Sequence, residues 1–93
     1  MRNNHLRKKY GMTPDDLIAL WSKQSGLCAL CDEPMLQYGG KGNRRAVIDH
    51  NHDTGRVRGL LHDWCNRILG LFGDDPRRLE QAAEYLRAGL TPG

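Results

Sequence analysis

A chain of 93 residues is long enough for one domain, and a domain of this size buries only roughly 60 to 65% of the surface of its unfolded chain. It therefore needs a stabilising element besides its apolar core. The three cysteines cannot all pair with one another, and no apolar run near the N-terminus is long enough for a signal peptide or a membrane span. We expect a soluble, cytoplasmic protein with no membrane partner, whose cysteines serve as thiolate ligands. The net charge of +3 is typical of nucleic-acid binders without being diagnostic of them.

The chain begins with a polar segment that lacks apolar periodicity. Its basic residues are Arg2, Arg7, Lys8 and Lys9. We predict that residues 1–12 form a basic N-terminal arm, which is disordered alone or docks late. The folded domain is expected over residues 13–88, and a short tail over residues 89–93.

A first helix is predicted to begin after Thr13, which suits a helix cap, with Pro14 at the first helical position. The acidic residues that follow are favoured at the positive end of the helix dipole. Gly26 ends this helix. Its apolar face is expected to comprise Leu17, Leu20 and Trp21.

A β-hairpin is predicted in the middle of the chain. Residues 46–48 and 56–58 are short segments of β-forming residues. Residues 53–55, Asp-Thr-Gly, suit the turn between them.

Two further helices follow the hairpin. The first is expected over residues 63–71, with Asn66 off its buried face. The residues expected on this buried face are Trp64, Ile68, Leu71 and Phe72. The last helix is predicted to begin at Asp75-Pro76 and to stop at Gly89. Together, these elements predict an α+β fold.

Two pairs of residues have the spacing of zinc ligands. They are Cys28-x-x-Cys31 and His62-x-x-Cys65, and a hairpin fits between them. The cysteines have an alternative role as small buried hydrophobic residues. His62 has two alternatives, a solvated residue at a helix start or a member of a catalytic group. We favour one structural zinc ion held by all four residues, which would add roughly 10 kcal/mol or more to folding.

The run Asp49-His50-Asn51-His52 lies between the two pairs and predicts hydrolytic chemistry. Asp49 and Asn66 offer oxygen ligands for Mg²⁺ or Mn²⁺. The side chain of histidine titrates near neutral pH. His50 therefore suits the general base that deprotonates the water attacking a phosphodiester bond. Neighbours on a strand point to opposite faces, so Asp49 and His50 can share a site only if the strand ends there and the chain turns, with Asn51 holding the turn. His52 either touches the phosphate or leaving group or is simply exposed to solvent.

Basic residues surround this run. Arg56 and Arg58 would face the same way on a strand, where they could hold a phosphate group. The alternative is that they are ordinary solvated charges. The candidate DNA-binding residues are Arg44, Arg45, Arg56 and Arg58.

These motifs occur in the order found in a known family. They are Cys-x-x-Cys, Val-Ile-Asp-His-Asn-His, Thr-Gly-x-Val-Arg-Gly-Leu-Leu and Cys-Asn-Arg-x-Leu-Gly. The sequence resembles the phage recombination endonuclease VII family within the HNH, or ββα-metal, nucleases, from about residue 27 to residue 86. The segment Leu-Phe-Gly-Asp-Asp-Pro and the helix after it resemble the tail of short phage members.

The resemblance implies a small zinc-stabilised ββα-metal (His-Me finger) domain with flanking helices. It implies that Asp49 and Asn66 hold the catalytic cation, that His50 is the general base, and that His62 joins the cysteines in holding zinc. The family usually has Cys where this chain has His62, which gives a Cys₃His site. The resolvase that names the family also has further helical regions for dimerisation and for branched DNA, so cleavage of four-way junctions does not carry over.

We therefore expect a DNA endonuclease of low sequence preference that nicks or cuts DNA with one catalytic divalent ion. DNA is the expected partner, a monomer is favoured, and the location is the host cytoplasm if a phage encodes the chain. One alternative is a zinc-stabilised nucleic-acid-binding module without catalysis, and another is a zinc domain that binds a protein partner. The combination of Asp49, His50 and Asn66 argues against the first, since binding alone needs no base beside a pair of cation ligands. The clustering of arginines around the hairpin argues against the second.

Overall fold

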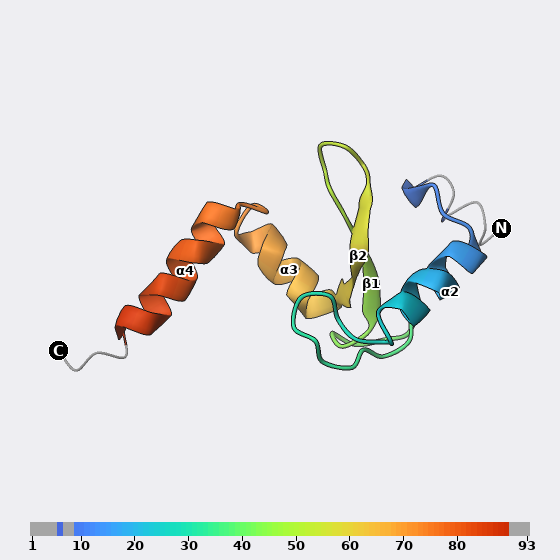
Figure 1. The fold of residues 1–93 in the computed structure, drawn as a ribbon, viewed down its shortest axis with the longest axis horizontal. Coiled ribbons are helices and arrows are strands. Elements are labelled where there is room, and N and C mark those ends of the chain that lie inside the picture. Colours follow the sequence, from blue (N-terminus) through green and yellow to red (C-terminus); the bar gives the residue numbers. More distant parts are fainter. Residues whose placement is uncertain (1–5, 7–8, 90–93) are drawn as a thin grey trace.

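The computed structural model describes residue 6 and residues 9–89. In chain order its elements are helix α2 (Pro14–Lys23), strands β1 (Ala46–His50) and β2 (Val57–His62), and helices α3 (Asp63–Leu71) and α4 (Pro76–Gly89) (Figure 1). The two strands pair antiparallel, and α3 follows β2 directly and packs against both strands. The predicted α+β fold is confirmed.

Helix α2 begins where the sequence predicts. The backbone N–H of Asp16 donates to the Thr13 hydroxyl at 3.1 Å, and the backbone N–H of Thr13 donates to the Asp16 carboxylate at 3.0 Å. This reciprocal pair satisfies donors that the first helical turn leaves open. After the helix ends at Lys23, Gly26 takes a φ of +69°, which lets the chain turn back toward the sheet.

The hairpin is longer than predicted, since β1 extends to His50 and β2 to His62. Asn51 holds the connection, because its side-chain oxygen accepts from the backbone N–H groups of Asp53 and Thr54 at 2.8 and 3.0 Å. This side-chain turn confirms the role predicted for Asn51.

Gln24, at the end of α2, ties the helix to the sheet. Its side chain accepts from the backbone N–H of Leu60 at 2.8 Å and donates to the carbonyl groups of Leu60 and Leu27, each at 2.9 Å. Leu60 is fully buried, so these bonds satisfy backbone groups that water does not reach. Sequence reasoning did not single out this residue.

The apolar core lies between α2, the hairpin and the start of α3. Cys28 and Cys65 belong to it, and so do Leu6 and Met12 from the predicted N-terminal arm. Residues 1–5 and 7–8 of that arm and residues 90–93 of the predicted tail lie outside the described residues.

The orientation of α3 differs from the prediction. Trp64 is 45% exposed and Leu71 is 82% exposed, whereas Cys65 is buried and Leu69 packs against the core. The predicted buried positions of Trp64 and Leu71 are therefore wrong. The inward face follows Cys65 and Leu69, which are one helical turn apart, because the cysteine must face the other sulfur atoms.

Helix α4 begins at Pro76, as predicted, after Asp75 accepts from the backbone N–H of Arg77 at 2.9 Å. It extends away from the hairpin at the C-terminal end of the molecule (Figure 1), and it leaves Tyr85 and Leu86 exposed. Across the described part of the chain, no helix combines the length and the apolar character needed to cross a membrane.

A candidate metal centre and a polar cluster on the hairpin

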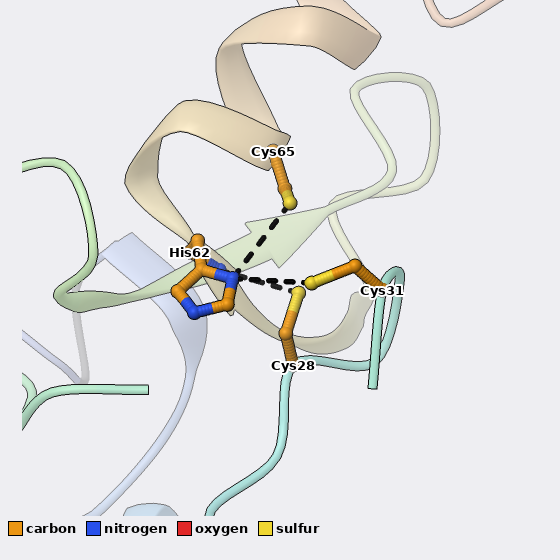
Figure 2. Close-up of side chains that lie close together, drawn as sticks. All are labelled: Cys28, Cys31, His62 and Cys65. Atoms are coloured by element: carbon orange, nitrogen blue, oxygen red, sulfur yellow. Dashed lines mark hydrogen bonds between the residues drawn. The ribbon is translucent and has the colours of Figure 1, made fainter. Parts of the chain in front are cut away.

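The four residues predicted to bind zinc converge in space. Figure 2 shows Cys28 and Cys31 on a tight loop that faces the junction of β2 and α3, from which His62 and Cys65 project. One ligand atom from each residue lies within 4.8 Å of the others. The Nδ1 atom of His62 lies 3.3 Å from Cys31 Sγ and 3.8 Å from Cys65 Sγ. These distances bracket the separation of about 3.5 Å expected between nitrogen and sulfur ligands on a tetrahedral zinc ion.

The ring of His62 is held in the form that a metal requires. Its Nε2 atom lies 2.8 Å from the carbonyl oxygen of Pro34. A carbonyl can only accept, so Nε2 carries the proton and Nδ1 keeps a lone pair directed at the sulfur atoms. His62 is only 2% exposed, so the alternative of a solvated residue is wrong.

The surroundings of the cysteine sulfur atoms shift the pKa values of Cys28 and Cys65 in opposite directions. Backbone N–H groups of Leu30 and His62 donate to Cys28 Sγ, each at 3.4 Å. Burial raises the pKa of the Cys28 thiol, but these and other hydrogen bonds outweigh it and lower this pKa to about 7. Burial and the neighbouring Cys28 and Cys31 raise the pKa of Cys65 to about 12. Three thiolates this close repel one another, and a divalent cation among them removes that repulsion, so the donor set suits zinc.

The second group of predicted residues gathers at the far end of the hairpin from His62. Asp49 and His50 are the last two residues of β1. The Asp49 carboxylate is buried, and the ring of His50 is half-buried between two other rings. It contacts Tyr10 edge to face with 5.6 Å between centroids, and His52 at 4.7 Å.

A β-bulge in β2 lies opposite this pair. Asp49 pairs with Gly59 and His50 pairs with Val57, so Arg58 is the extra residue of the ladder. A bulge redirects side chains locally and is frequent beside functional sites. Strand β1 ends at His50 and the chain turns at Asn51, which is the condition that the sequence set for a shared site. The register of the ladder also changes between Asp49 and His50.

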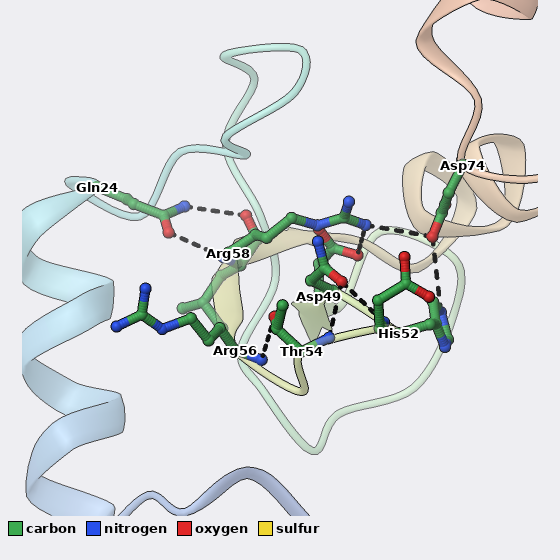
Figure 3. A network of polar contacts seen from close by, with 10 residues as sticks. Gln24, Asp49, His52, Thr54, Arg56, Arg58 and Asp74 are labelled. Atoms are coloured by element: carbon green, nitrogen blue, oxygen red, sulfur yellow. Dashed lines mark hydrogen bonds and ion pairs between the residues drawn. The ribbon is translucent and has the colours of Figure 1, made fainter.

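The bulge directs the side chain of Arg58 to the Asp49 carboxylate. Its Nε atom donates to Asp49 Oδ2 at 2.7 Å and one Nη atom donates to Oδ1 at 2.9 Å. These hydrogen bonds raise the pKa of Arg58, so the guanidinium stays charged. The same Nη atom lies 3.5 Å from Asp74 Oδ2, and His52 Nε2 lies 3.7 Å from that oxygen (Figure 3).

Asp74 is the member of this cluster that sequence reasoning missed. It lies in the turn between α3 and α4, with a φ of +56°, and its backbone N–H donates to the Leu69 carbonyl at 2.8 Å. The turn after Gly73 brings it back toward the hairpin. It belongs to the segment Leu-Phe-Gly-Asp-Asp-Pro noted in the sequence, and that segment is the signal that could have drawn attention to it.

The remaining candidates lie at different positions. Asn66 is half-buried on the first turn of α3, directly after Cys65. Arg45 is bound to Asp63 at 3.2 Å and to the Gly42 carbonyl at 2.8 Å. Arg44 is exposed, and Figure 3 shows the exposed Arg56 directed away from Asp49.

The chain is similar to known proteins over most of its length. The profile of the family described as recombination endonuclease VII matches residues 3–88. The chain is 40% identical over 79 residues to the Gene 59 protein of Mycobacterium phage D29, covering 84% of this chain and 45% of that protein. It is 38% identical over 78 residues to the Gene 59 protein of Mycobacterium phage L5, covering 83% and 44%. The chain thus spans less than half the length of these relatives. No solved structure matches it significantly.

Proposed function

Because the chain belongs to the recombination endonuclease VII family, we propose that it is a metal-dependent endonuclease that hydrolyses phosphodiester bonds in DNA. We propose a one-metal mechanism of the HNH type with low sequence preference. The observation that carries the proposal is the placement of Asp49 and His50 at the end of β1, on a hairpin that α3 packs against. A buried carboxylate beside a half-buried imidazole is the pair that this hydrolysis requires.

The cysteine centre has a structural role in this proposal. Cys28, Cys31, His62 and Cys65 hold zinc and so tie the loop of residues 28–33 to the start of α3. Asn66 follows Cys65 on that helix, so the zinc centre also fixes the position of a proposed catalytic residue.

Asp49 and Asn66 hold the catalytic cation, Mg²⁺ or Mn²⁺. Their carboxylate and amide oxygens are the ligands that these hard ions prefer. Once bound, the ion supplies positive charge for the phosphate in the transition state. Burial of Asp49 strengthens such an interaction, because water screens it less there.

His50 is the general base that accepts the proton of the attacking water. Its ring contacts with Tyr10 and His52 limit the orientations that it can adopt. Arg58 and His52 lie on the same side of the hairpin and bind the phosphate, and the exposed Arg44 and Arg56 extend the basic surface for DNA. Arg45 contributes charge from its place beside Asp63.

A nicking assay on supercoiled plasmid tests this function. Zinc-loaded protein is expected to nick the plasmid with added Mg²⁺ or Mn²⁺ and to stop when these ions are omitted. Omission is better than a chelator, since a chelator also removes the structural zinc. DNA binding without nicking under every divalent ion would instead favour the alternative of a non-catalytic binding module.

A further inference from the structure

The two oxygens of Asp49 already have a positively charged partner in the free protein. Arg58 covers them with two hydrogen bonds of 2.7 and 2.9 Å. Such a bidentate pair is among the strongest side-chain interactions, and its planar fork takes one lone pair from each oxygen. A cation that binds the same carboxylate must compete with this guanidinium.

The backbone aims Arg58 at Asp49. Arg58 is the extra residue of the bulge between the pairs Asp49–Gly59 and His50–Val57. Arg58 has no paired residue on β1, so the bulge sets the direction of its side chain and the regular alternation of the strand does not. The contact is therefore built into the fold of the hairpin.

A second carboxylate, that of Asp74, lies on the outer side of the Arg58 guanidinium. Asp74 Oδ2 lies 3.5 Å from the Nη atom that also serves Asp49. Asp74 is held in place by its backbone hydrogen bond to Leu69, and its side chain is more exposed than that of Asp49. A guanidinium that leaves Asp49 can therefore keep an ion pair with the Asp74 carboxylate.

Space for this movement lies beside the pair. A hollow of about 530 Å³ opens between the hairpin loop and the turn after α3, and both Arg58 and Asp74 line it. Gly70 and Gly73 line it too, and having no side chains they leave room for the guanidinium.

We propose that Arg58 is a cation gate: its guanidinium occupies the Asp49 carboxylate in the free protein, and the divalent cation displaces it toward Asp74. The displaced guanidinium then faces the hollow, where it is available to a phosphate group. This inference rests on the proposed function, since it takes Asp49 as the ligand of the catalytic cation.

Mn²⁺ binding to zinc-loaded protein without DNA, measured by electron paramagnetic resonance, tests the gate. Arg58→Gln is expected to lower the Kd for Mn²⁺ by about tenfold, which is about 1.4 kcal/mol, because the competitor is gone. Arg56→Gln removes the same charge two residues away on a side chain directed away from Asp49, and it is expected to leave this Kd unchanged. Equal effects of the two variants would reduce the gate to a general charge effect and overturn it.

Asp74→Asn should act in the opposite direction. Without its outer acceptor, Arg58 stays on Asp49, so the Kd for Mn²⁺ is expected to rise several-fold. In an Arg58→Gln background the same substitution is expected to have no effect, since Asp74 acts through Arg58. An undiminished effect in that background would overturn the role of Asp74.

Asp49→Ala separates this inference from the proposed function. If it abolishes Mn²⁺ binding while Arg58→Gln leaves the Kd unchanged, the gate is wrong and the ligand assignment stands. If Asp49→Ala leaves Mn²⁺ binding intact, the ligand assignment itself is wrong, and the gate with it. Zinc content and circular dichroism establish that each variant is folded.

Discussion

His62 and His50 lie at opposite ends of the same two-stranded sheet, and their surroundings differ. His62 is 2% exposed, and one of its ring nitrogens contacts the Pro34 carbonyl while the other faces sulfur atoms. The ring of His50 is half-buried and packs against the rings of Tyr10 and His52. His52 itself is 72% exposed and touches Asp74.

In the proposed function, this difference separates a structural centre around His62 from a reactive centre around His50. Saturating both nitrogens of a buried histidine fixes one conformation, which suits a ligand of structural zinc. A general base must instead exchange a proton with water beside the substrate, so it needs access. The variants below test this division from the largest expected effect to the smallest.

Removing a zinc ligand should unfold the domain. Cys65→Ser is expected to lose the cooperative thermal transition and the bound zinc together, because metal binding and folding are coupled in domains this small. Leu71→Ser, on the exposed side of the same helix, is the matched control and should retain both. Elemental analysis and circular dichroism measure the outcome. A wild-type protein that is folded and free of zinc would contradict the structural role.

Removing the proposed base should silence a folded protein. His50→Ala is expected to lower the nicking rate about a hundredfold or more, which corresponds to about 2.7 kcal/mol, while zinc content stays intact. Single-turnover nicking of plasmid DNA measures this. Full activity in folded His50→Ala protein would end the assignment of His50 as base.

Loss of a proposed cation ligand should weaken the site without unfolding it. Asn66→Ala is expected to raise the Kd for Mn²⁺ by about tenfold or more. Even the loss of a residue that only hydrogen-bonds to a metal ligand typically weakens metal affinity by about tenfold or more. High Mn²⁺ should then restore part of the nicking rate. Titration calorimetry on zinc-loaded protein decides the matter, and an unchanged affinity would remove Asn66 from the ligand set. Retained zinc would show that the neighbouring Cys65 still holds its ion.

The smallest effect is expected for His62→Cys. A fourth thiolate should keep zinc and nicking activity, but the Pro34 carbonyl loses its donor, which costs about 1 kcal/mol. A cost of that size lowers the Tm by about 4 to 8 °C in a domain of this length. His62→Ala is the contrasting variant, with lower zinc affinity and a larger loss of Tm. An inactive His62→Cys protein with full zinc occupancy would instead place His62 in the catalytic group.

Sequence alone determined the features that depend on neighbouring residues. Thr13 and Pro14 set the start of α2, and the Asp-Pro pair sets the start of α4, because caps are formed within one helical turn. The four residues that could hold a metal ion were also recognisable, since the x-x spacing within each pair lets both side chains reach one ion. The hairpin and the side-chain turn of Asn51 followed from the same kind of short-range pattern.

Only the tertiary structure decided which faces and partners these elements take. Apolar periodicity placed Trp64 and Leu71 inside, yet Cys65 must face the other sulfur atoms, and this rotates α3 so that both are exposed. The contact of Arg58 with Asp49 depends on a bulge, and a bulge is a property of the pairing between two strands. Asp74 reaches the same cluster through the turn after α3, so its role depends on how that helix packs against the hairpin. Such contacts join residues far apart in the chain, and no local pattern specifies them.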